Sequence, residues 1–282
     1  MDPDHNPVGE AGTGTLLPMP AEISDVWWVD GVLTDGAGLA GDPGLRHLVG
    51  LTTGLVPRYW CHVGSTSARW VADELATAVG SLGAAPLPRS AVGHAIDGGG
   101  DAGDLVVVSA LPMSPGSGYP ALGEVEVVVE PADPIPMPAT IDVVGSPWPR
   151  TVGPSSGIPL VGDAELAVGR RLARDRGVDA AVWWSTEGRL VGVDDANVVV
   201  ELDGRLCTPP TTDGALASAW RYRLVGSAGI DVVERSIADH EWMIDDGAVA
   251  LWPWGAVSAI GGPDTAARHL GAISAAVGED PR

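Results

Sequence analysis

The stretch ARDRGVDAAVWWSTEGRLVGVDDANVVVEL, residues 173–202, joins the end of a helix to two strands and decides the fold. A charged helical pattern ends at Gly177, because glycine is the residue that most often follows a helix. The apolar run at 180–184 and the β-branched run at 197–202 predict strands, with Glu187-Gly188 as a turn between them. A helix that leads directly into strands indicates a fold that mixes α and β structure.

The same pattern continues on both sides of this stretch. Asp203-Gly204 predicts a hairpin turn, and a helix from about Asp213 to Leu224 and strands at 230–236 and 248–252 follow. A helix from Asp163 to Arg176 precedes it, with acidic residues at its start and arginines towards its end. The helix dipole favours this order of charges, which supports the helix assignment.

The first half of the chain carries a similar mixture of elements. Residues Ser65–Gly83 have helical spacing of apolar side chains, and β-branched runs at 105–111 and 125–129 predict buried strands. Residues 146–159 are rich in proline, glycine and serine, so we place a boundary between two lobes there. We therefore expect an α+β (mixed α/β) fold with the following parts: a flexible tail at 1–21, a small lobe at 22–150 and a larger lobe at 151–282.

Composition excludes several kinds of chemistry. The 282 residues carry a formal net charge of −21, all 16 basic residues are arginine, and there are 11 tryptophans but no phenylalanine. Without lysine the chain offers no side-chain amine for a Schiff base and no phosphate-binding lysine. The acidic balance argues against nucleic acid or an anionic membrane as a partner. The acidic N-terminus is unlike a signal peptide, and the two cysteines fit a reducing compartment, so we expect a cytoplasmic protein.

The larger lobe resembles the class IV aminotransferases, a family that includes aminodeoxychorismate lyases, branched-chain aminotransferases and D-amino acid aminotransferases. The resemblance runs without a gap from 157 to 221 and rests on Gly157-Ile158-Pro159, the stretch quoted above, Leu202–Pro210 and Gly214–Arg221. The smaller lobe matches weakly. The resemblance implies the two-lobed fold of D-amino acid aminotransferases, with pyridoxal phosphate held between the lobes, and a homodimer.

The chain departs from the family at the positions that hold the cofactor. Pro159 stands where the resemblance places the Schiff-base lysine, and Gly192 stands where it places the glutamate that binds the pyridine nitrogen. Glu74 takes the place of the phosphate-binding arginine, and Trp220 that of the threonine before Arg221. The resemblance therefore implies a degenerate family member that lacks the Schiff-base lysine and binds no pyridoxal phosphate.

Several residues are candidates for the former cofactor cleft. Tryptophans there either wall a pocket for a flat ligand or fill the vacated space. The pair Asp194-Asp195 either faces a ligand or forms a solvated turn, and Arg221 either binds a carboxylate or serves as an ion-pair partner. The candidate cleft residues are Glu74, Asp194, Asp195, Asn197, Trp220, Arg221, Trp252 and Trp254.

Three functional hypotheses remain open. The first is a pseudoenzyme that binds a small carboxylate or aromatic ligand or serves as a scaffold. The second is an enzyme that acts on a small carboxylate without pyridoxal phosphate, and the third is a pyridoxal-dependent aminotransferase or lyase. An open pocket with a buried carboxylate and Arg221 favours the enzyme, whereas a cleft sealed by tryptophan favours the scaffold. No two of the six histidines have a metal-ligand spacing, so we expect no metal site.

Overall fold

The structure is a computed structural model of the full chain. It describes the following residues: 26–29, 32–35, 56–84, 86–112, 125–153, 155–161, 164–226, 229–244, 247–261 and 263–278. The tail predicted at 1–21 lies outside the described residues. A short hairpin of two antiparallel strands, β1 (Val26–Val29) and β2 (Val32–Asp35), precedes the two lobes.

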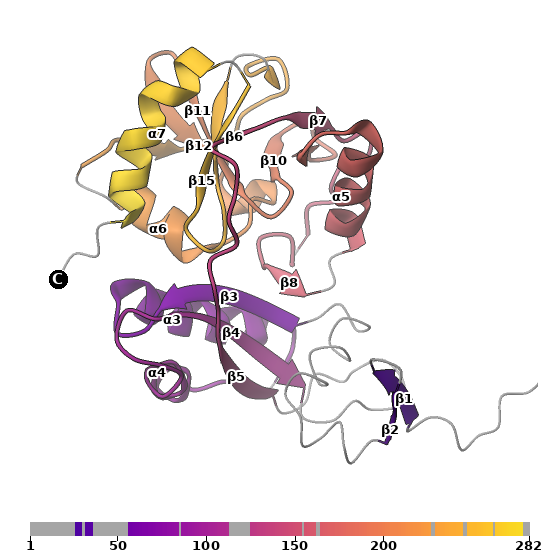
Figure 1. Ribbon diagram of the computed structural model, residues 1–282, viewed down its shortest axis with the longest axis vertical. Helices are drawn as coiled ribbons and strands as arrows, with labels where there is room; N and C mark the ends of the chain where they lie inside the picture. The colour runs from indigo at the N-terminus through magenta and orange to yellow at the C-terminus, as the bar shows by residue number, and fades with distance from the viewer. Residues whose placement is uncertain are drawn as a thin grey trace, which may run out of the picture.

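The smaller lobe is an antiparallel four-stranded sheet with two helices packed on one face (Figure 1). The strand order is β5-β4-β3-β8, and helix α3 packs against both β3 and α4. Ser65 begins α3, because its side chain accepts a hydrogen bond from the backbone N–H of Ala68. The elements are β3 (Val56–His62), α3 (Thr66–Ser81), α4 (Arg89–Asp97), β4 (Leu105–Pro112), β5 (Val125–Pro131) and β8 (Leu160–Val161).

Strand β3 has two chemically different faces. Tyr59 and Cys61 are buried in the core under α3, as alternation along a strand requires. Arg58, Trp60 and His62 are only half buried and alternate with them on the opposite face. In Figure 1, β3 runs along the part of the smaller lobe that is nearest to the larger lobe. The face of β3 that carries Arg58, Trp60 and His62 therefore lies between the lobes.

The larger lobe contains a six-stranded and a three-stranded sheet. The first has the order β13-β12-β11-β14-β15-β6 and the second the order β10-β9-β7. Helix α7 packs against β14 and β15, and α5 packs against β9 and β7. The elements are β6 (Thr140–Ile141), β7 (Val143–Gly145), α5 (Ala164–Arg176), β9 (Ala180–Trp184), β10 (Leu190–Val193), β11 (Asn197–Leu202), β12 (Arg205–Thr208), η2 (Thr211–Asp213), α6 (Ala219–Val225), β13 (Val232–Glu234), β14 (Ala248–Leu251), β15 (Val257–Ile260) and α7 (Pro263–Gly278).

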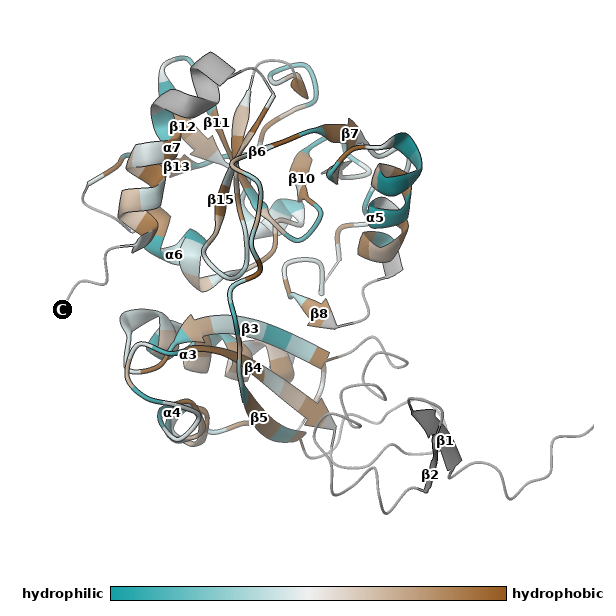
Figure 2. Ribbon diagram, viewed as in Figure 1, coloured by the Kyte–Doolittle hydropathy of each residue, from teal (hydrophilic) through white to brown (hydrophobic). Residues whose placement is uncertain are grey.

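The chain crosses between the lobes three times. After β5 it enters the larger lobe, where β6 pairs with β15 and β7 pairs with β9. It then returns briefly, because β8 pairs with β3 of the smaller lobe before α5 begins. The larger core gathers aliphatic side chains around the fully buried Trp220 and Trp242. In Figure 2 the hydrophilic residues of α5 contrast with the apolar strands around it.

The predicted strands at 180–184 and 197–202 are confirmed as β9 and β11. The helix predicted from about Asp213 is wrong at its start. Gly214 adopts a left-handed conformation with φ of 98°, which ends η2, and α6 begins only after Ser218, whose side chain caps it. Among the described residues, no helix combines the length and apolar character needed to cross a membrane.

Candidate functional site

A cleft of about 630 Å³ lies between the two lobes. Strand β3 of the smaller lobe forms one side, and α5, the turn between β10 and β11, and the loop between β14 and β15 form the other. The cleft therefore contains side chains from segments that are far apart in sequence. The lining of the cleft includes Arg58, Trp60, Pro159, Arg170, Asp194, Asp195, Trp252, Pro253 and Trp254.

Three tryptophans form an aromatic wall of the cleft. Trp252 and Trp254 stack with ring centroids 5.5 Å apart and an angle of 22°, and Trp60 lies 5.7 Å from Trp254. The indole N–H groups of Trp252 and Trp254 are already used, because Trp252 donates to Ser258 Oγ and Trp254 donates to the carbonyl of Ile135. These two indoles consequently offer π-surface rather than hydrogen-bond donors, which suits a flat apolar ligand.

Arg58 brings a positive charge to the same wall. Its guanidinium lies over the Trp60 ring, with Cζ 5.7 Å from the centroid, which is within the range of a cation–π contact. Its Nε is buried and has no hydrogen-bond partner. Burial lowers the pKa of Arg58, with the charge of Glu130 acting in the opposite direction, but a guanidinium still stays charged at neutral pH.

Asp194 supplies a buried carboxyl group. It occupies a tight turn after β10 with φ of 46°, a conformation that aspartate tolerates better than most residues. Only 5% of the residue is exposed, and its Oδ1 accepts a hydrogen bond from the backbone N–H of Ala181 at 3.2 Å. Burial raises the pKa of Asp194 to about 6, although that hydrogen bond and the charge of Arg170 oppose the shift.

Asp195 stands beside it and is differently placed. Its Oδ2 pairs with Arg170 at 2.9 Å, whereas its Oδ1 is buried and has no hydrogen-bond partner. The two neighbouring aspartates thus present a carboxyl group of raised pKa and a paired carboxylate with one unused acceptor. A buried acceptor without a partner is costly, and a ligand donor at this point would remove the cost.

The backbone around Gly192 has no room for a side chain. A Cβ added there would lie 2.7 Å from the carbonyl oxygen of Ala196, which belongs to the turn that carries the two aspartates. Both Val193 and Ala196 are held by reciprocal backbone hydrogen bonds across this turn. Any residue larger than glycine would therefore force the turn to move.

Pro159 lies at the edge of the cleft with its carbonyl oxygen in use. That oxygen accepts a hydrogen bond of 2.9 Å from the backbone N–H of Arg58, next to the short pairing of β3 with β8. Proline itself has no N–H to donate. The main chain of Pro159 therefore continues the pairing of β8 with β3.

Four of the predicted residues do not line the cleft. Arg221 is buried in α6, where it donates to the carbonyl of Pro209 at 2.8 Å and pairs with Glu234. The side-chain amide of Asn197 donates to Ser218 Oγ at 3.1 Å, which supports the cap of α6. Arg221 and Asn197 therefore hold α6 in place.

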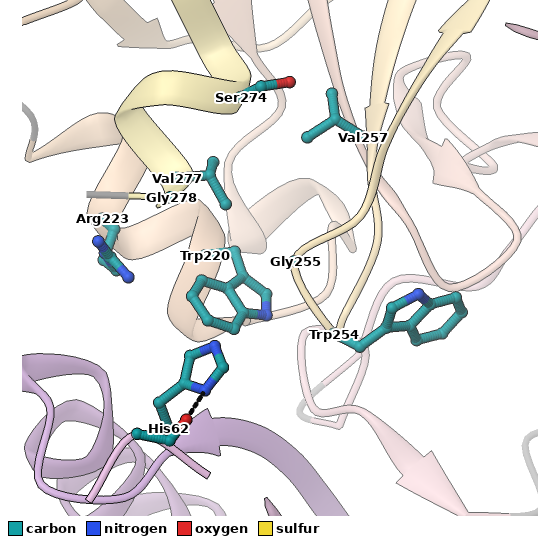
Figure 3. A pocket seen from close by; sticks show the side chains of 10 residues that line it. His62, Trp220, Arg223, Trp254, Gly255, Val257, Ser274, Val277 and Gly278 are labelled. Atoms are coloured by element: carbon teal, nitrogen blue, oxygen red, sulfur yellow. Dashed lines mark hydrogen bonds between the residues drawn. The ribbon is translucent and has the colours of Figure 1, made fainter. Parts of the chain in front are cut away.

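The other two are Trp220 and Glu74. Trp220 is fully buried and donates from its indole to the carbonyl of Pro253, so it packs beneath the loop that carries Trp252 and Trp254. It lines a second cavity, shown in Figure 3. Glu74 lies on α3, where burial and then the charge of Asp73 raise its pKa.

The sequence of the chain matches the family model for class IV amino-transferases over residues 101–248, more than half of its length. The chain belongs to this family. No curated protein matches it in sequence. Among the described residues, no group of three histidine, cysteine, aspartate or glutamate side chains lies close enough together to hold a metal ion.

Solved structures support the class IV aminotransferase fold. The branched-chain aminotransferase of Thermoproteus uzoniensis is similar with a TM-score of 0.64 and 20% identity, covering 91% of this chain and 96% of that one. The branched-chain aminotransferase of Thermobaculum terrenum in its PLP form gives 0.62 and 17%, covering 91% and 94%. A putative 4-amino-4-deoxychorismate lyase from Legionella pneumophila gives 0.59 and 17%, covering 74% and 82%.

Sequence reasoning missed three charged or aromatic residues of this class IV cleft. Arg58 and Trp60 lie in a region for which the resemblance gave no alignment, and Arg170 was assigned only to a helix end. The usable signal was the alternation in β3, because residues two apart on a strand share a face. Arg58 and Trp60 could have been placed together on that ground.

Proposed function

We propose that this chain is a ligand-binding member of the class IV aminotransferase family that functions without pyridoxal phosphate. The observation that carries the proposal is the open cleft of about 630 Å³, which is walled by stacked indoles and has Pro159 at its edge. An open cleft of this volume favours ligand binding over a purely structural scaffold, because small-molecule sites typically enclose about 300–1,000 Å³.

The residues present do not fit pyridoxal phosphate. Its aldehyde requires an amine, and the chain has no lysine at Pro159 or elsewhere. At the position that the resemblance gives to the pyridine-binding glutamate, Gly192 has no room for any side chain. Glu74, at the position that the resemblance gives to the phosphate-binding arginine, is acidic and does not line the cleft, and Pro253 lacks a backbone N–H. These replacements remove the anchors at both ends of the cofactor.

The residues of the cleft fit a flat organic carboxylate instead. Stacking against Trp252 and Trp254 would hold an apolar ring, and Arg58 would bind the carboxylate through charge-assisted hydrogen bonds. A hydrogen-bond donor on the ligand would reach the unused acceptor of Asp195. The cleft therefore combines an aromatic surface, a cation and an acceptor, which defines the class of ligand that we propose.

The cofactor part of the proposal is tested by absorption spectroscopy. The purified protein is mixed with pyridoxal phosphate, dialysed and scanned across the visible range, with free cofactor as the reference. We expect no saturable absorption band to remain after dialysis. A band that survives dialysis, together with turnover of an amino acid, would overturn the proposal and restore a pyridoxal-dependent enzyme.

The ligand part is tested by calorimetric titration with flat carboxylates, including benzoate and 4-aminobenzoate as probes. We expect saturable binding that Arg58→Gln weakens about tenfold, since a bidentate charge-assisted contact is lost. Arg171→Gln on the surface of α5 is the matched control and should bind as the wild type does. Equal affinity of all three proteins, or no saturable binding by any of them, would refute this assignment of the cleft.

One observation favours an enzyme as the second candidate. Asp194 faces the cleft and burial raises its pKa to about 6, which is the range that suits a general acid or base. The enzyme hypothesis then rests on Asp194 without Arg221, because Arg221 does not line the cleft. Asp194→Asn should abolish turnover of a bound carboxylate while leaving its affinity nearly unchanged. If no bound carboxylate is turned over by the wild type, this second candidate fails.

We also infer a homodimer from the family resemblance, and a cytoplasmic location from the two cysteines, which fit a reducing compartment. The dimer is supported by the resemblance alone. Analytical ultracentrifugation tests it directly, with a sedimenting mass near 28.8 kDa as the result that contradicts it.

A further inference from the structure

A small recess of about 10 Å³ adjoins the cleft between the lobes. Most of the residues that line the recess also line the cleft, and these shared residues are Arg58, Trp60, Pro159, Asp195, Leu216 and Pro253. The other residues that line it are Tyr59, Ala217 and Ser218, which are all buried. The recess is therefore an extension of the cleft that ends against buried residues.

The volume of the recess limits what can enter it. A space of about 10 Å³ holds one water-sized group, which means one non-hydrogen atom with its hydrogens. An aromatic ring is too large, so the ring of a ligand stays in the wider part of the cleft against Trp252 and Trp254. A substituent of one heavy atom on that ring has the right size. The polar atoms of the lining then decide which substituent is preferred.

Two buried polar atoms in this lining have no hydrogen-bond partner among the described residues. One is an acceptor, Oδ1 of Asp195, and the other is a donor, Nε of Arg58. A hydroxyl group suits both kinds of atom, because it has a proton to donate and lone pairs that accept. A methyl group or a fluorine atom has no polar hydrogen to donate. An aromatic amine donates, but its lone pair is shared with the ring and accepts poorly.

The charges around the recess favour a donor that is neutral. The carboxylate of Asp195 is already paired with Arg170, through its Oδ2 at 2.9 Å. The lining of the recess contains the guanidinium of Arg58 as well. An ammonium group would be repelled by these two cations. A hydroxyl group adds no charge, so it can bond to Asp195 without this repulsion.

We propose that the recess is a specificity site for a hydroxyl group, and that the ligand of the cleft is a flat carboxylate with a hydroxyl group on its ring. The hydroxyl group donates to Oδ1 of Asp195, and its oxygen accepts from Nε of Arg58. The terminal nitrogens of Arg58 remain for the carboxylate. This inference rests on the function proposed for the cleft and defines its ligand class more narrowly.

The test compares each isomer of hydroxybenzoate with the fluorobenzoate that carries fluorine at the same ring position. Fluorine is close to a hydroxyl group in size but cannot donate, so each pair of ligands isolates the hydrogen bond. In calorimetric titration of the full chain, at least one hydroxybenzoate should bind about tenfold more tightly than its fluorinated counterpart. Equal affinities within every pair would overturn the proposal. Tighter binding of the corresponding aminobenzoate than of that hydroxybenzoate would also overturn it.

A pair of variants locates the preference in the recess. In Asp195→Asn the amide oxygen should face Arg170, so the amide nitrogen replaces the acceptor of the recess by a donor. We expect this variant to lose the preference for hydroxyl over fluorine. Asp179→Asn is the matched control and should keep the preference, because Asp179 lines the cleft but not the recess. A preference that survives in Asp195→Asn, with the variant folded by circular dichroism, would refute the role of the recess.

The titrations separate this inference from the function proposed for the cleft. Benzoate that binds the wild type and is weakened by Arg58→Gln, without any preference for a hydroxyl group, would refute the recess alone. Absence of saturable binding by every flat carboxylate would overturn both proposals. Because the comparison of hydroxyl with fluorine is made on the wild type, it holds even if a variant fails to fold.

Discussion

The cleft and the packing around α6 each contain an arginine that is paired with an acidic side chain, but the two pairs differ in their surroundings. Arg221 is buried and bonds to the carbonyl of Pro209 as well as to Glu234. Arg170 pairs with Asp195 while 53% of its side chain stays exposed, and one oxygen of Asp195 has no partner. The arginine that matches the family motif is thus structural, and the charges that face the cleft come from other positions.

The largest effect on stability is expected at Gly192, where the backbone leaves no space for a side chain. Gly192→Ala would bring a methyl group against the carbonyl of Ala196 and should lower the free energy of unfolding by about 3 kcal/mol. Urea denaturation measures the change. Gly93→Ala in α4, where a Cβ has no neighbour within 4 Å, is the control and should leave stability unchanged or raise it by about 1 kcal/mol.

The structural role of Arg221 predicts the next largest loss. Arg221→Ala removes a buried guanidinium from two partners and should cost about 2.5 kcal/mol, less than a fully buried pair because 44% of Glu234 is exposed. Arg171→Ala, on a pair whose side chains are 80% and 65% exposed, should cost less than about 0.5 kcal/mol. Equal losses of stability for Arg221→Ala and Arg171→Ala in chemical denaturation would contradict the structural role of Arg221.

Asp194 predicts a dependence of stability on pH. Its pKa is raised from 3.8 to about 6 in the folded protein, so the folded state holds this proton more tightly than the unfolded chain does. Its contribution to stability is therefore full below about pH 3.8 and is lost as the pH rises through about 6.

Asp194→Asn removes this titration and keeps the acceptor for Ala181. Between pH 4.5 and 7, the stability of the wild type should fall by about 2 kcal/mol relative to the variant. The difference between the two proteins cancels the titration of the other carboxyl groups. Parallel pH profiles of the two proteins in urea denaturation would contradict the raised pKa.

The smallest effect on stability is expected at Asp195. Asp195→Asn removes an ion pair whose arginine is half exposed, so the free energy of unfolding should change by less than about 0.5 kcal/mol. The same variant should alter the affinity for the flat carboxylates, because it changes an acceptor inside the cleft. A large loss of stability without an effect on binding would show that Asp195 has a structural role, as Arg221 does.

Local sequence patterns were sufficient for much of the larger lobe. The strands at 180–184 and 197–202 were predicted because β-branched and aromatic runs end at turn residues. The start of α6 was missed, since its cap at Ser218 and the left-handed Gly214 before it compete with a continuous helical pattern. Helices α4 and α7 were not predicted.

The candidate site was harder to predict than the fold. Pro159, the two aspartates, Trp252 and Trp254 do line the cleft, and the family resemblance located all of them. The role of Arg221 depends on Pro209 and Glu234, and such tertiary partners have no local sequence signal. Arg58 and Trp60 could be assigned to a common face only once the strand that contains them was known.

Strand β3 contributes side chains to both the cleft and the second cavity. Arg58 and Trp60 face the cleft, His62 faces the second cavity, and the contact of Trp60 with Trp254 lies between them. Because Arg58, Trp60 and His62 are spaced two residues apart on one strand, the same face of β3 borders both spaces.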